Sequence, residues 1–398
     1  MHSIRKLLLL IFVACFIPIL GACTDSSSKL APDRYIEGYD TQYFQLSMIN
    51  KEAKLQNSSV GCILYHDRFL YQFDQKNHTI MPLCSQPNCL HDQETDPEKL
   101  EQCRAYLGEP MNEAYLSVQL YNKNVYVFFE KAIDSGRYAC LYRVSEDGSN
   151  KELIFRQQDM SVDLPIIHRG YLYFHGQSYS VDSSGISSGS GIFRVNVNDR
   201  TAKLESVKQS EANTGYGFMN AYGKYVYFDE GNLFAYNTED GSITDCGENY
   251  GNYAFFEGKL LYQTYNSDEG SSFKSPVIRS ELDNSNPTEM LTDIPQGYYV
   301  SADQKYIYLN NAPMVTWGTE TTKQFWVYDE NWKLVDEFTV PDTDTSYLDP
   351  PIGGSDYQYE IFDDPDTGEW GLLVWDKSKI GSYNGAAFEQ QRIVYGAK

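Results

Sequence analysis

Gly223-Lys224-Tyr225-Val226-Tyr227 is the stretch of sequence that decides the fold. A polar turn is followed by alternating aromatic and aliphatic residues, which is the pattern of a β-hairpin. The same phrase recurs along the chain, and a search for internal repeats therefore governs the interpretation of the whole sequence. In chain order the copies are Asp67–Tyr71, Asn122–Tyr126, Arg169–Tyr173, Gly223–Tyr227, Gly258–Tyr262, Gln304–Tyr308 and the weaker Ser355–Tyr359.

The spacing of these copies predicts the architecture. Their closing tyrosines are separated by 35 to 55 residues. Many copies have a second strand-like phrase downstream that ends in a turn, such as Leu233–Tyr236 before Glu239-Asp240-Gly241. Four short strands per unit of roughly 40 to 50 residues are typical of propeller blades. We predict an all-β protein with a β-propeller of seven blades. Six or eight blades, a pair of β-sandwiches and a β-solenoid are the alternatives, and the uneven spacing argues against the solenoid.

The composition of the 398 residues agrees with an all-β chain. It includes 33 Tyr and 20 Phe, which suit pleated surfaces, and 29 Gly, which suit turns. No segment of helical length repeats apolar residues with helical spacing.

The N-terminus has the features of an export signal. Arg5 and Lys6 precede an apolar run of 14 residues, Leu7–Leu20, whereas a membrane-spanning helix needs about 20 residues. The exit, Leu20-Gly21-Ala22-Cys23, resembles the lipobox of bacterial lipoproteins, in which the cysteine is diacylated and becomes the new N-terminus. We expect a signal peptide at 1–22, lipid on Cys23, a flexible tether at 23–35 and the propeller at 36–398. An ordinary signal peptide cleaved near Ala22 is the alternative.

Charge bears on the location and partners. The net charge of −23 becomes −25 when residues 1–22 are removed, because only Arg5 and Lys6 go with them. No basic patch is visible, so nucleic acid is not an expected partner. We expect a protein anchored by lipid to the extracytoplasmic face of the cell membrane.

An insertion at 84–113, after the first blade, carries the most distinctive local motif. Cys84, Cys89 and His91 lie within eight residues of one another, and Cys103 follows an acidic stretch. Three thiolates and an imidazole could close a tetrahedral structural zinc site. A disulfide is favoured over the metal by the extracytoplasmic location, and a third possibility is neither. The odd number of cysteines complicates pairing, and Cys62, Cys140 and Cys246 are expected to be buried apolar groups.

With this motif the chain resembles a family of uncharacterised lipoproteins from Gram-positive bacteria. These share a lipobox, a propeller-like body and a C-x4-C-x-H…C loop after the first blade. Their propeller looks like the low-density-lipoprotein-receptor-related type, grouped as a domain of unknown function. The resemblance covers most of residues 23–398 and is sharpest from Cys84 to Cys103. It implies the architecture and the location, and no activity.

No catalytic residues are predicted. Gly185–Gly189 matches G-x-S-x-G but lies in a Ser/Gly-rich stretch without the strand and helix that a nucleophile elbow needs, so we expect a hairpin loop. Asp364–Glu369 resembles a truncated calcium loop and is expected to be a turn. His168 and His175 are expected to be core or surface histidines.

The leading functional expectation is a non-catalytic binding or scaffold module on the cell surface. Its ligand would be a glycan, a peptide or a protein, and Trp317, in the loop 314–322, is a candidate contact. The alternatives are a glycan-active enzyme that uses carboxylates of the propeller funnel and a structural factor for envelope assembly.

Overall fold

The chain divides into two units, Met1–Pro32 and Asp33–Lys398, and every residue described below belongs to the second. The computed structural model describes residues 36, 40, 54–112, 116–133, 136–182, 185–199, 203–210, 219–248, 250–264, 274–295, 298–311, 323–340, 356–385 and 391–396. The lipobox with Cys23 and the candidate contact Trp317 lie outside these residues.

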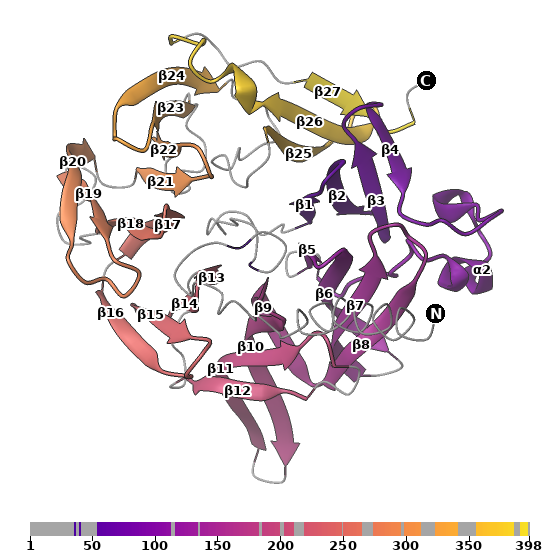
Figure 1. The fold of residues 1–398 in the computed structure, drawn as a ribbon. Helices are drawn as coiled ribbons and strands as arrows, with labels where there is room; N and C mark the ends of the chain where they lie inside the picture. The colour runs from indigo at the N-terminus through magenta and orange to yellow at the C-terminus, as the bar shows by residue number, and fades with distance from the viewer. Residues whose placement is uncertain are drawn as a thin grey trace, which may run out of the picture. The chain divides into compact units, whose positions relative to one another are not determined.

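The second unit is a seven-bladed β-propeller, as the repeats predict (Figure 1). Each blade is an antiparallel sheet built from one continuous stretch of chain. Blades 1 and 2 contain β1 (Leu55–Asn57), β2 (Gly61–His66), β3 (Phe69–Asp74), β4 (Thr79–Pro82), β5 (Ser117–Tyr121), β6 (Asn124–Ile133), β7 (Gly136–Ser145) and β8 (Lys151–Gln158). Blades 3 and 4 contain β9 (Met160–His168), β10 (Tyr171–Asp182), β11 (Gly185–Asn196), β12 (Glu205–Gln209), β13 (Met219–Tyr222), β14 (Tyr225–Asp229), β15 (Asn232–Asn237) and β16 (Ile243–Glu248).

The remaining blades follow in chain order. Blades 5 and 6 contain β17 (Tyr250–Phe256), β18 (Lys259–Thr264), β19 (Lys274–Ser280), β20 (Thr288–Pro295), β21 (Tyr299–Ala302), β22 (Ile307–Asn310), β23 (Lys323–Tyr328) and β24 (Leu334–Val340). Blade 7 contains β25 (Tyr357–Asp363), β26 (Trp370–Asp376) and β27 (Gln391–Val394), with a 3-10 helix, η4 (Lys377–Lys379), after β26. Between β4 and β5 the chain forms another 3-10 helix, η1 (His91–Gln93), and a short α-helix, α2 (Pro97–Gln102). No helix among the described residues is long and apolar enough to cross a membrane.

The repeated phrase places a tight hairpin turn before a strand that is buried on both faces. At Asn122-Lys123 both turn residues have positive φ, 45° and 58°, as type I′ hairpins require. Along β10, Tyr173 packs toward blade 4, whereas its neighbours Leu172 and Phe174 pack toward blade 2. Because neighbouring blades cover both faces of a sheet, aromatic and aliphatic residues alternate with no polar face between them.

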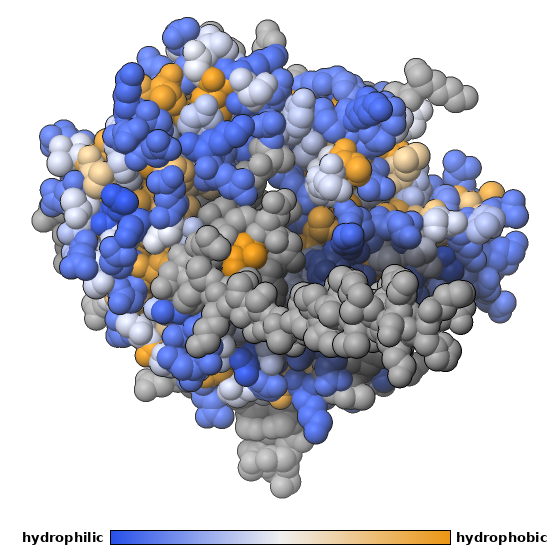
Figure 2. All heavy atoms as spheres, viewed as in Figure 1, coloured by the Kyte–Doolittle hydropathy of each residue, from blue (hydrophilic) through white to orange (hydrophobic). Residues whose placement is uncertain are grey.

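The hydrophobic core is divided among the interfaces between blades. The buried residues of the described part form seven clusters, and each joins two adjacent blades. The cluster between blades 2 and 3, for example, runs from Phe128 on β6 to Phe174 on β10, whose rings lie 5.0 Å apart. On the face shown in Figure 2, hydrophilic residues predominate and apolar residues are scattered. The apolar side chains are thus buried by the packing of each blade against its two neighbours.

Two sequence interpretations of local segments have different outcomes. The prediction of a loop at Gly185–Gly189 is wrong, because these residues form the first part of β11 and pair with Asp182–Ser178 of β10. The β10–β11 hairpin therefore continues through Gly185–Gly189. The turn at Asp364–Glu369 is confirmed: the Gly368 N–H donates to Asp364 O, and the Asp364 carboxylate accepts from two backbone N–H groups.

Candidate metal centre

Cys84 follows blade 1 directly and touches blade 2. It lies two residues after β4, and the N–H of the next residue, Ser85, donates to the carbonyl of Gly148 in the β7–β8 turn at 3.1 Å. Gly148 has a φ of +66°, and a Cβ at this position would come within 2.8 Å of the Cys84 nitrogen. Only glycine therefore allows the two backbones to approach this closely.

Two left-handed residues turn the chain back toward Cys84. Asn88 and His91 have φ values of 60° and 53°, conformations that non-glycine residues adopt infrequently. The turn at Asn88 is closed by the Cys89 N–H, which donates to Gln86 O at 3.4 Å. As a result Cys89 and His91 come from one short loop, with His91 at the first position of η1.

Helix α2 delivers the fourth side chain. Asp96 caps its N-terminus by accepting the Glu98 N–H at 3.0 Å, and Pro97 occupies its first position. Cys103 is the C-cap, so its side chain is placed where the helix ends. Lys151 of β8 donates to the carbonyls of Cys103 and Tyr106, both at 2.7 Å. A cation at a helix C-terminus satisfies carbonyls that have no partner within the helix.

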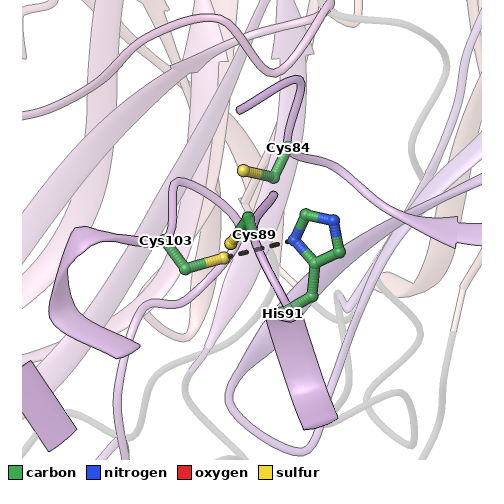
Figure 3. Close-up of side chains that lie close together, drawn as sticks. All are labelled: Cys84, Cys89, His91 and Cys103. Carbon is green, nitrogen blue, oxygen red and sulfur yellow. Dashed lines mark hydrogen bonds between the residues drawn. The ribbon is translucent and has the colours of Figure 1, made fainter. Parts of the chain in front are cut away.

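The four side chains converge (Figure 3). The Sγ atoms of Cys84, Cys89 and Cys103 and a ring nitrogen of His91 all lie within 4.8 Å of one another. Cys103 Sγ is 3.7 Å from His91 Nδ1. In a tetrahedral zinc site with bonds of about 2.3 Å to sulfur and 2.0 Å to nitrogen, this edge would be about 3.5 Å. The cluster is thus a Cys3His set that could hold a metal ion such as zinc.

The protonation states fit metal binding. Burial raises the pKa of Cys84, but hydrogen bonds from the backbone of Gln86 and Arg104 and from the neighbouring thiols outweigh it, so that the net pKa is lowered. Burial also lowers the pKa of His91, which keeps its imidazole neutral at neutral pH. Burial and a hydrogen bond with Cys89 raise the pKa of Cys103 to about 12. This buried thiol needs a cation nearby in order to ionise.

The other cysteines do not join this cluster. Cys62, Cys140 and Cys246 are buried in β2, β7 and β16, which confirms their role as small apolar groups. All six cysteines of the described residues are free thiols. The predicted grouping of Cys84, Cys89, His91 and Cys103 is therefore formed without a disulfide among them in this structure.

The histidines of blade 3 remain apart from the centre. His168 ends β9 and is fully buried, with Nε2 2.8 Å from Gly223 O. His175 is buried on β10 and pairs in register with Asp163. Both are core histidines, as the sequence predicts.

The residues that position the centre were not predicted from the sequence. Lys151 and Gly148 lie in blade 2, more than 40 residues after Cys103, and nothing in the local sequence links them to the loop. Asp92, next to His91, was also missed. Its Oδ2 accepts hydrogen bonds from Tyr71 at 3.0 Å and from Tyr395 at 2.7 Å.

Comparisons with known proteins relate the fold to propeller domains of peptidases and of oligogalacturonate lyase. No family model matches the sequence, and no curated protein matches it. Prolyl oligopeptidase B from Galerina marginata is similar over 88% of this chain and 52% of that chain, with 11% identity and a TM-score of 0.50. The propeller domain of the Trilobed protease from Pyrococcus furiosus is similar over 71% and 83%, with 12% identity and a TM-score of 0.44.

An oligogalacturonate lyase in complex with manganese is similar over 85% of this chain and 86% of that chain, with 11% identity and a TM-score of 0.47. The chain spans about half of the peptidase from Galerina marginata. At these identities the likeness concerns the propeller fold alone.

Proposed function

We propose that this chain is a lipid-anchored, extracytoplasmic propeller that acts as a non-catalytic binding or scaffold module and carries a structural zinc ion. The observation that carries the zinc ion and its structural role is the convergence of Cys84, Cys89, His91 and Cys103 within 4.8 Å. Four protein ligands complete a tetrahedral shell, whereas a catalytic zinc keeps one position open for water or substrate. The centre therefore supports a structural role.

The anchor rests on the sequence. Leu20-Gly21-Ala22-Cys23 resembles a lipobox, and the resemblance to Gram-positive lipoproteins extends to the Cys84–Cys103 loop. Lipid on Cys23 would attach the protein to the outer face of the cell membrane. Exchanging Cys23 for alanine should abolish labelling with a fatty acid and release the protein from membranes. Unchanged labelling of the C23A variant would exclude lipid attachment at this residue.

The binding role rests on how the blades use their surfaces. Both faces of the blades are covered by neighbouring blades, so partners must bind at loops and strand edges. A glycan, a peptide or a protein is the ligand class that we propose, with Trp317 as a candidate contact. A thermal-shift screen of residues 24–398 against cell-wall fragments, oligosaccharides and peptides tests this role, because a ligand that binds only the folded state raises the melting temperature. A shift that persists in a W317A variant would remove Trp317 from the site.

The metal is tested by stoichiometry and spectroscopy. Residues 24–398 purified with zinc should contain one zinc ion per chain, and cobalt substitution should give thiolate-to-metal charge-transfer bands. C84S should lose both. C140A is the matched control, because Cys140 is a buried free thiol in β7 outside the cluster. A disulfide between any two of Cys84, Cys89 and Cys103 in the native protein, found by mass spectrometry, would overturn the zinc assignment.

A further inference from the structure

The ring closes between blade 7 and blade 1 without a shared strand. Among the described residues every sheet comes from one continuous segment, so that no sheet contains strands from both ends of the propeller. Blade 7 lies beside blade 1, and β25 contacts β1 (Figure 1). In the described part of the chain, side chains alone therefore hold this seam together.

The cysteines of the metal centre belong to the core of this seam. One hydrophobic cluster contains Tyr71 and Phe73 of β3 together with Tyr359, Leu372 and Val374 of blade 7. Cys103 is a buried member of the same cluster, and the side chains of Cys84 and Cys89 pack against it. The centre is thus embedded where the first and last blades meet.

Asp92 connects the metal loop to both sides of the seam. It follows the ligand His91 directly, and its Oδ2 accepts hydrogen bonds from Tyr71 on β3 and from Tyr395, just after β27. The two tyrosine rings are 5.2 Å apart in an edge-on arrangement, with Trp370 packed against both. Burial and the nearby Asp92 carboxylate raise the pKa values of both hydroxyls, so they remain protonated donors. Hydrogen bonds to a charged acceptor are the stronger kind.

The same loop is fixed to blade 2 at two points. Lys151 holds the carbonyls of Cys103 and Tyr106, and Gly148 packs against the backbone of Cys84. The loop also pairs with blade 1, since Tyr106 forms a β-bridge with Phe69. Because three blades contact this one loop, a change in its conformation reaches the seam from both sides.

We propose that the Cys3His centre is the clasp of the propeller ring: metal binding fixes the loop so that Asp92 ties blade 7 to blade 1. This inference rests on the proposed zinc site and adds a regulation to it, namely that ring closure depends on metal. Without metal the loop has no covalent or coordinate link between Cys84, Cys89 and Cys103, and the position of Asp92 is no longer set by His91. The seam then keeps its apolar contacts and two other polar contacts, the His66–Asp363 and His78–Gln391 pairs.

Hydrogen exchange of residues 24–398 with and without zinc tests the clasp, and zinc content is measured on the same samples. Chelation of wild-type protein should accelerate amide exchange in β25–β27 by about tenfold or more, as expected for the loss of hydrogen bonds to a charged group. Exchange in β13–β16 of blade 4, on another part of the ring, should change little. In D92A, zinc should still bind, but β25–β27 should exchange as fast as in chelated wild type with or without zinc.

Two further variants sharpen the result. Y395F removes one hydroxyl without altering the loop and should reproduce part of the D92A effect, whereas E98A on the exposed face of α2 should behave as wild type. If zinc binds and the exchange of β25–β27 is the same with and without it, the clasp is wrong while the zinc site stands. Equal acceleration in blade 4 would also overturn the clasp, because the metal would then stabilise the whole fold. If no zinc binds, the zinc site and the clasp fall together.

Discussion

His168 makes the stability of the propeller depend on pH in a defined window. Its side chain is fully buried, and Nε2 lies 2.8 Å from the Gly223 carbonyl and 4.0 Å from Asp40 Oδ1. Burial lowers its pKa from 6.5 to about 4, although Asp40 and the Gly223 carbonyl act in the opposite direction. The folded protein therefore resists protonation of this histidine.

The sign follows from proton binding in the two states. Between about pH 6.5 and pH 4 the unfolded chain binds a proton at position 168 that the folded chain does not bind, so stability falls as the pH is lowered. Above pH 6.5 both states are neutral and the contribution vanishes. With one pKa unit worth about 1.4 kcal/mol, lowering the pH from 8 to 5.5 removes about 1.4 kcal/mol through this residue. Carboxylates of ordinary pKa stay ionised over this range.

The variant H168Q tests the reasoning, because glutamine can keep a donor near the Nε2 position but takes up no proton. Urea unfolding of both proteins at pH 8 and pH 5.5 gives the change in unfolding free energy for each. The wild type should lose about 1.4 kcal/mol more than H168Q. His175, whose pKa burial also lowers to about 4, is present in both proteins and cancels. H78Q, at an exposed histidine, should match the wild type, and equal losses in wild type and H168Q would refute the argument.

Three substitutions test the contacts that fix the metal loop to blade 2 and those that join blade 6 to blade 7. G148A should destabilise the protein by about 1–3 kcal/mol and weaken zinc retention, because the added Cβ would meet the Cys84 backbone. G241A is the control for backbone strain alone, because Gly241 also has a positive φ, +76°, but has more open space around it. Similar effects of the two substitutions on urea unfolding and zinc content would contradict the prediction for G148A. K151M should lower the unfolding free energy by about 1–3 kcal/mol, because the hydrogen bonds of Lys151 to the carbonyls of Glu101, Cys103 and Tyr106 are lost. An unchanged urea midpoint would show that this lysine does not fix the loop. The Asp336 carboxylate accepts hydrogen bonds from three backbone N–H groups of the segment after η4. D336A should therefore make this segment cleavable by protease. Unchanged resistance to protease would show that other contacts hold the segment.

Much of the ring could be predicted from sequence because both faces of a blade strand are buried. Alternating aromatic and aliphatic residues after a polar turn identify such strands, as Tyr227 and Val226 do in blade 4 by packing toward opposite neighbours. The order of the strands within blade 1 was harder to predict. In blade 1 the repeated phrase Asp67–Tyr71 marks the turn between the second and third strands, β2 and β3. The first strand, β1, is short and half-buried and has no comparable pattern.

The metal centre could be predicted only as a set of residue types. Four ligand residues lie within 20 positions of one another, which a local pattern can show. Whether their atoms converge depends on the positive φ values at Asn88 and His91, and neither residue type demands that conformation. The bonds of Asp92 with Tyr395, 303 residues away, depend on the closed ring and leave no local signal.

The position of the centre at the seam has a consequence for ligand binding. A partner that contacts strands or loops from both blade 1 and blade 7 recognises the closed ring, so it binds more tightly when zinc holds the clasp shut. By reciprocity such a partner also increases the affinity for zinc. Ligand screens should therefore show larger thermal shifts, beyond the effect of zinc alone, for zinc-loaded wild type than for D92A, which binds zinc but lacks the hydrogen bonds of Asp92 to Tyr71 and Tyr395. Equal added shifts in the two proteins would place the ligand site away from the seam.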